Sequence, residues 1–174
     1  MADQPFELKN LTVLIVDKNG YMRRMTRTML LTLGIRSVVE AADGVTALEK
    51  IRTCNPDVLL LDWDCTILSA VEVMQIIRSP GVFPRPDLPT VMLTSQPNRS
   101  YVMQAMQVGV HEILLKPTSS QALHDRILSA VFNKRPMMKF GKYYVPQPRT
   151  IGSSSESSNS NLSAGDLLAA AAIS

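Results

Sequence analysis

The chain has 174 residues, two cysteines and a formal net charge of +3. This length suits one typical domain followed by a tail, and two cysteines exclude a disulfide-framework protein. No apolar run approaches a membrane span and no basic-then-apolar opening suggests a signal peptide, so we expect a cytoplasmic protein without a membrane span.

Strand-like and helix-like segments alternate from residue 11 to residue 132. Strands are expected at 11–16, 37–40, 58–61, 90–93 and 113–115, where short apolar runs occur. Helices are expected at 21–33, 45–54, 70–78, 99–108 and 120–132, and a long loop at the proline-rich stretch 80–89. Five such strand–helix units predict an α/β fold with a doubly wound, five-stranded parallel sheet of order 2-1-3-4-5 and five helices.

Side-chain spacing predicts which helix faces enter the core. His111 and His124 have no partners at metal-ligand spacing, and we expect both histidines at the surface or in turns. The stripes expected in the core are Met22, Met25 and Met29 in the first helix, Val45, Leu48 and Ile51 in the second, and Leu123, Ile127 and Val131 in the last.

Four of the expected strands end at polar residues: Asp17, Asp62, Thr94 and Lys116. The carboxyl ends of parallel strands meet at one edge of the sheet, where open α/β sheets bind ligands. A carboxylate can attack a phosphoryl donor, an ammonium and a hydroxyl can hold the transferred group, and a second carboxylate can hold a hard cation. The pattern therefore indicates phosphoryl transfer onto a carboxylate.

Six short motifs together carry a resemblance to one family. They occupy residues 14–17, 22–24, 40–44, 61–63, 93–95 and 115–117. Over about residues 9–133 the chain resembles the receiver domain of two-component response regulators, in particular the stand-alone chemotaxis-type (CheY-like) receivers of flavodoxin-like fold. The resemblance implies that Asp62 is the phosphoacceptor and that Thr94 and Lys116 hold the phosphoryl group. It also implies Mg²⁺ held by Asp17, Asp62 and the backbone carbonyl of Asp64, and a cis bond before Pro117.

Three positions depart from the family pattern. Lys18 stands where the family has a second acid, which removes a Mg²⁺ ligand and adds a cation, so we expect weak metal binding. Lys18 can either pair with Asp62, in part replacing the metal, or lie solvated at the start of a helix. The loop 65–70 lacks the usual proline and Asp-Gly, and Ile113 replaces the aromatic of the fifth strand, which excludes a rotamer switch there.

The positive charge lies after the expected domain. Residues 1–125 hold twelve Lys and Arg against thirteen Asp and Glu, whereas residues 126–149 hold six bases and no acid. In the extension 134–151 these bases alternate with Phe140, Tyr143 and Tyr144 among three prolines. This extension can pack on the domain or stay solvated, bind a protein, or bind a nucleotide. The serine-rich and alanine-rich tail 152–174 is expected to be disordered.

We therefore expect a single-domain response regulator that is not an enzyme with a separate substrate. A histidine kinase or histidine phosphotransfer protein would phosphorylate Asp62, and the output would be contact with a downstream target protein, without a DNA-binding domain. One alternative is a pseudo-receiver, a binding module that Lys18 keeps unphosphorylated. The other is a cyclic di-GMP effector: some stand-alone receivers bind this ligand with a similar tail, whose Arg-Pro opening Arg135 and Pro136 match, although only Arg149 remains at its close.

Overall fold

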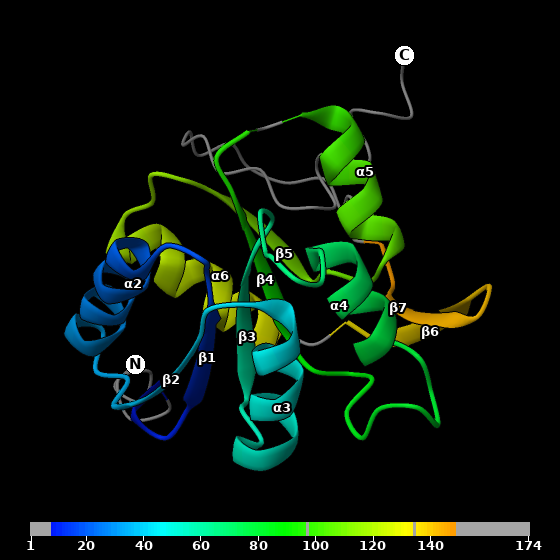
Figure 1. Ribbon diagram of the computed structural model, residues 1–174, viewed down its shortest axis with the longest axis horizontal. Helices are drawn as coiled ribbons and strands as arrows, with labels where there is room; N and C mark the ends of the chain where they lie inside the picture. The colour runs from blue at the N-terminus through cyan, green and yellow to red at the C-terminus, as the bar shows by residue number, and fades with distance from the viewer. Residues whose placement is uncertain (1–7, 97, 134, 149–174) are drawn as a thin grey trace.

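The computed structural model describes residues 8–96, 98–133 and 135–148. Five parallel strands form one sheet in the order β2-β1-β3-β4-β5, so the predicted doubly wound sheet is confirmed (Figure 1). The strands are β1 (Thr12–Val16), β2 (Ser37–Ala41), β3 (Val58–Asp62), β4 (Thr90–Thr94) and β5 (Glu112–Leu115). Strands β3 and β4 are fully buried, as apolar runs covered on both faces should be.

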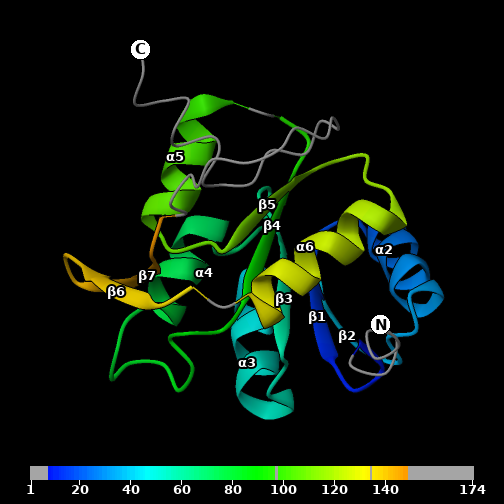
Figure 2. The ribbon, with the colours of Figure 1, turned by 180° about the vertical axis from the view of Figure 1, so that it is seen from behind.

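Helices cover both faces of the sheet. Helices α2 and α6 share one core with one face, and helices α3, α4 and α5 share a second core with the other face (Figures 1 and 2). The helices are α2 (Gly20–Thr32), α3 (Gly44–Cys54), α4 (Ala70–Ile77), α5 (Arg99–Gln107) and α6 (Ser120–Phe132). No helix within the described ranges has the length and apolarity that crossing a membrane requires.

Polar N-caps fix where the helices begin. Asn19 accepts hydrogen bonds from the first backbone N–H groups of α2, and Asp43 does the same for α3. At α4, Ser69 and Glu72 bond each other's backbone N–H groups in a capping box. These caps end the loops that leave β1, β2 and β3, so they also fix the backbone beside the carboxyl edge of the sheet.

The predicted stripes of two helices are confirmed only in part: Ile51 is buried and Met29 and Leu48 pack against the cores. In α2 the fully buried residues are Thr26 and Leu30, whereas Met25 is 40% exposed. In α3 Val45 is half exposed, and Ala47 and Ile51 form the buried face with Gly44. The stripe Leu123, Ile127 and Val131 of α6 is buried as predicted.

The basic and aromatic extension forms a β-hairpin that packs on the domain. Strands β6 (Met137–Phe140) and β7 (Tyr143–Pro146) pair antiparallel and lie beside α4 and α5, drawn in orange in Figures 1 and 2. The Tyr144 N–H donates to the Arg78 carbonyl at 3.2 Å, and the Arg135 guanidinium donates to the His111 carbonyl. Val145 is buried as well, so the hairpin is an extra layer on the five-stranded fold.

A fully buried arginine connects the hairpin to the sheet. Arg78 has no exposed surface, and burial lowers its pKa to about 9. Gly109 adopts φ +84°, and a Cβ added there would lie 2.9 Å from the Tyr144 carbonyl oxygen, so glycine permits this close approach. The guanidinium bonds the carbonyls of Pro86, Leu88 and Gly109, the hydroxyl of Thr90 and the Nδ1 of His111.

His111 lies in the bend between α5 and β5, in line with the turn alternative, but it is not at the surface. This side chain is 4% exposed, and its Nδ1 also lies 3.2 Å from the Thr90 N–H. Two donors, Thr90 N–H and Arg78 Nη2–H, point at that nitrogen, so Nδ1 is the acceptor and the ring is neutral with its proton on Nε2. The histidine therefore serves the packing of β4, β5 and Arg78.

Candidate functional site

Two carboxylates and one ammonium meet at the carboxyl edge of the sheet. Val16 pairs with Leu61 in the β1–β3 ladder, so the next residues, Asp17 and Asp62, are neighbours. The Lys116 Nζ, which follows β5, donates to Asp17 Oδ2 at 2.8 Å and to Asp62 Oδ1 at 2.7 Å. The side chains of Asp17 and Asp62 are 5% and 6% exposed and that of Lys116 is 12% exposed, so the predicted acids and lysine form one largely buried cluster.

The electrostatics of this cluster favour charge on the lysine more than on Asp62. Burial raises the pKa of Asp62, although the hydrogen bond from Lys116 opposes the shift. Burial alone would lower the pKa of Lys116, but its hydrogen bonds to Asp17 and Asp62 outweigh that effect and raise it. Lys116 is therefore a fixed cation, and Asp62 is a carboxylate whose charge is poorly solvated.

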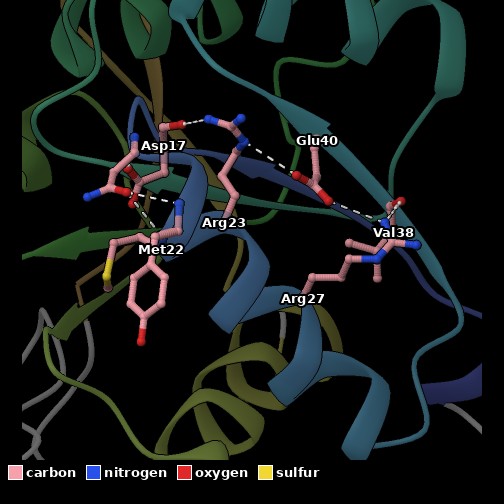
Figure 3. Close-up of polar contacts among 8 residues, drawn as sticks. Asp17, Met22, Arg23, Arg27, Val38 and Glu40 are labelled. Atoms are coloured by element: carbon pink, nitrogen blue, oxygen red, sulfur yellow. Dashed lines mark hydrogen bonds and ion pairs between the residues drawn. The ribbon is translucent and has the colours of Figure 1, made fainter.

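An arginine that sequence reasoning did not single out supports Asp17 from behind. The Arg23 guanidinium donates to the Asp17 backbone carbonyl at 2.7 Å and pairs with Glu40 of β2 at 3.3 Å (Figure 3). Arg27 also pairs with Glu40, and the Asn19 N–H donates to Asp17 Oδ1 at 2.8 Å. The only sequence signal for this support was the presence of Arg23 and Glu40 in two of the matching motifs.

The remaining candidate residues lie at the edge of the site. Thr94 ends β4 and is buried, but its hydroxyl donates to the Gln96 carbonyl at 3.2 Å. Asp64 and Lys18 are exposed. In the structure the lysine that pairs with Asp62 is Lys116, whereas Lys18 is exposed. The Lys116–Pro117 bond is cis, as the resemblance implied.

The loop after Asp62 is held to the neighbouring helix. The Gly44 N–H donates to the Thr66 carbonyl at 3.1 Å, and a Cβ at Gly44 would lie within 3 Å of both Val73 and Leu68. Burial raises the pKa of the Cys65 thiol to about 11, so this thiol is protonated at neutral pH. Cys65 is therefore a packing residue of the loop.

An aromatic pair lies directly beside the phosphoacceptor candidate. The ring of Trp63 stacks on Tyr101 of α5, with centroids 4.9 Å apart and planes 27° apart. Thr94 and Ile113 line a cavity of about 10 Å³ next to this pair. Ile113 contributes no ring here, so α5 supplies the aromatic contact that the fifth strand lacks, and Trp63 becomes a natural fluorescent probe of the site.

The donor set fits a magnesium site built on two carboxylates. Mg²⁺ in proteins needs only one or two carboxylates because waters and phosphate oxygens complete its shell. Asp17 and Asp62 are adjacent and share one ammonium, as two ligands of one cation would. Across the residues that the structure describes, no group of three or more His, Cys, Asp or Glu side chains could hold a metal. Position 18, where the resemblance implies a further acid, is lysine in this chain.

Comparisons with known proteins agree with this geometry. Residues 13–128 match the family model described as response regulator receiver domain. The chain is 32% identical over 115 residues to the chemotaxis protein CheY of Pseudomonas aeruginosa, covering 66% of this chain and 91% of that protein. It is 30% identical over 119 residues to CheY-3 of Vibrio cholerae, covering 68% and 90%.

Solved structures show the same likeness. The receiver domain of the Francisella response regulator 1452 matches with a TM-score of 0.64 at 25% identity, covering 71% of this chain and 98% of that one. The Vibrio cholerae chemotaxis protein CheY4 matches with a TM-score of 0.62 at 26% identity, covering 69% and 98%. The chain therefore belongs to the response regulator receiver family of two-component signalling proteins.

Proposed function

We propose that this chain is a single-domain response regulator that accepts a phosphoryl group on Asp62 from a histidine kinase or histidine phosphotransfer protein. The observation that carries the proposal is the Lys116 Nζ, which lies 2.7 Å from Asp62 and 2.8 Å from Asp17. A cation held between two buried acids can follow the negative charge as it moves from a carboxylate to a phosphoryl group. The phosphoryl group stays on the chain itself, and no separate substrate is turned over.

The reaction assigns a separate role to each residue. An Asp62 oxygen attacks phosphorus, the new P–O bond forms, and the P–N bond to the donor imidazole breaks. Lys116 moves its hydrogen bond to a phosphoryl oxygen. The Thr94 hydroxyl, which now donates to the Gln96 carbonyl, donates instead to a second phosphoryl oxygen. Asp17 and Asp62 would hold Mg²⁺, which when bound neutralises charge on the phosphoryl oxygens. Arg23 keeps the Asp17 backbone in place from the opposite side.

Incubation with a small acyl phosphate, followed by intact mass measurement, tests the proposal. The wild-type chain is expected to gain one phosphoryl adduct that alkali or hydroxylamine removes. Asp62→Asn is expected to gain none, and Asp64→Asn is the matched control because Asp64 is exposed and would contribute only a backbone carbonyl. A labile adduct on Asp62→Asn would contradict the assignment, and a wild type that stays unmodified would favour the pseudo-receiver.

Metal affinity separates the receiver from the pseudo-receiver in a second way. Lys18→Asp is expected to tighten Mg²⁺ binding at least about tenfold, since it replaces a cation with an oxygen ligand. Titration of Trp63 fluorescence measures the affinity, and Lys9→Asp provides the same charge change at an exposed position outside the cluster. Saturation of the wild type at micromolar Mg²⁺ would contradict the expected weak site.

The tail-based cyclic di-GMP alternative has less support from the contacts of the extension. Arg135 and the following Pro136 match the Arg-Pro opening of that tail type. The Arg135 guanidinium already donates to the His111 and Gln147 carbonyls. Arg149, the other matching base, lies outside the described residues. Calorimetric titration of the full chain with cyclic di-GMP tests this ligand, and a Kd below about 10 µM would favour the alternative.

A further inference from the structure

An open groove lies between the hairpin and two helices, away from the acid cluster. Its volume is about 470 Å³, within the range of known ligand sites. Gln75 of α4 and Gln104 and Gln107 of α5 line one side. The hairpin turn lines the other side with Phe140, Lys142 and Tyr143.

One wall of the groove lies outside the part of the chain that the family model covers. Residues 13–128 match the family model, and the hairpin that forms one wall lies beyond them. The hairpin is held in place by Arg78, whose carbonyl accepts the Tyr144 N–H, and by the close approach at Gly109. A wall anchored in this way presents a defined surface.

The chemistry of the walls favours a peptide with negative charge. Lys142 is the one charged residue among the described residues that line the groove, so no carboxylate faces the ligand space. Lys139 is exposed on the same hairpin but is not among the residues that line the groove. Phe140 is 56% exposed and offers a large apolar contact, and the three glutamine amides can both donate to and accept from a peptide backbone.

A dinucleotide suits this groove less well. The Lys142 ammonium lies 5.3 Å from the centre of the Tyr143 ring, so a cation already covers one face on which a base would stack. No arginine lines the groove among the described residues, and a single lysine is a small complement for two phosphates. We infer that the groove formed by α4, α5 and the hairpin binds an extended acidic segment of a partner protein, with an apolar side chain of that segment against Phe140.

This interaction surface goes beyond phosphotransfer to Asp62 and does not require it. A fluorescein-labelled peptide of sequence Glu-Glu-Leu-Phe-Glu-Glu, titrated with the full chain, is the probe, and the same peptide with Gln at each Glu is its neutral match. The acidic peptide is expected to bind at least about tenfold more tightly than the neutral peptide. Its affinity is expected to fall when salt rises from about 50 to about 500 mM.

Substitutions at the groove locate the binding. Lys142→Glu is expected to weaken the acidic peptide about tenfold and Phe140→Ser about fivefold, while Lys9→Glu, an equal charge change outside the groove, stays within about twofold. Both groove residues are exposed, so each variant should keep the melting temperature of the wild type, and a neutral Lys142→Gln variant should lose less affinity than Lys142→Glu. Asp62→Asn should bind like the wild type, so a failure of phosphotransfer leaves this result intact.

Several results would overturn the inference. They are equal affinity for the two peptides, no binding at about 1 mM peptide, or an unchanged Kd in Lys142→Glu. Cyclic di-GMP that binds and is lost in Lys142→Glu would assign the groove to a nucleotide. Tighter peptide binding in a full chain with Leu167→Asp and Leu168→Asp would assign it to the chain's own C-terminal segment, and a dimer that Lys142→Glu dissociates would assign it to a second copy.

Discussion

Replacing Arg78 with Met is expected to lower the free energy of unfolding by about 3 kcal/mol or more. The guanidinium bonds three backbone carbonyls in two loops. Each buried carbonyl left without a donor costs about 1–3 kcal/mol, although the Leu88 carbonyl would keep the hydrogen bond from the Thr90 hydroxyl. Removing a buried charge recovers part of its desolvation cost, so the loss is smaller than the sum of these bonds. Thermal unfolding followed by circular dichroism is the measurement.

Arg85 supplies the matched control for Arg78. It also donates to a backbone carbonyl, that of Pro56, and to the Asn55 side chain, but it is only half-buried. Arg85→Met is therefore expected to cost about 1 kcal/mol or less. Hydrogen exchange at the Tyr144 amide should accelerate more in Arg78→Met than in Arg85→Met, because that amide bonds the Arg78 carbonyl. A melting temperature within about 2 °C of the wild type would contradict this account of the buried arginine.

The sheet and the polar residues at its carboxyl edge could be predicted from the sequence, because both depend on short local patterns when the strands are parallel. Each short apolar run ended at a polar residue, and parallel order brings those ends to one edge. The sharing of the Lys116 ammonium by two acids could not be predicted in the same way. Lys116 lies 99 positions after Asp17 and 54 positions after Asp62 in the sequence. Whether its ammonium reaches both acids depends on how far β5 extends past β3.

The errors arose where a neighbouring element decides which face is buried. Counting apolar residues favoured Met25 in α2, but the buried face carries Thr26 and Leu30, and Arg23 and Arg27 pair with Glu40 beside it. Arg78 looks like a surface residue at a helix end in sequence. It is buried only because the loops before β4 and β5 surround it with carbonyl groups, and no local pattern reports those contacts.

The hairpin shows a further limit of local pattern. The composition of 134–151 left packing or solvation, a protein partner and a nucleotide ligand all open. The deciding contacts come from residues far along the chain, namely the carbonyls of Arg78 and His111. The expectation that residues 9–133 form the domain remains a prediction, and the structure adds that removal of the hairpin would expose the surface around Arg78.

Replacing Lys116 with Met is expected to abolish the phosphoryl adduct and to lower the free energy of unfolding by about 2–3 kcal/mol at pH 7. The substitution leaves Asp17 and Asp62 buried together without their cation. We expect this loss of unfolding free energy to be smaller than for a fully buried ion pair, because the Lys116 side chain is 12% exposed. Urea unfolding in the presence of EDTA measures it without bound metal.

The stability that Lys116→Met loses relative to the wild type should become smaller as the pH falls. Burial already raises the pKa of Asp62, and Lys116→Met removes the hydrogen bond that opposes this shift, so the pKa rises further. The folded variant then binds a proton more tightly than the unfolded chain, and its stability falls as pH rises through that pKa. The urea midpoint of Lys116→Met should therefore recover toward that of the wild type as the pH falls from 7 toward the ordinary pKa of an aspartate. Asp62→Asn combined with Lys116→Met should recover at pH 7 without acid, since it removes one of the two facing charges. A variant whose midpoint stays constant with pH, or falls on acidification, would show that Asp62 is not the group that Lys116 keeps charged.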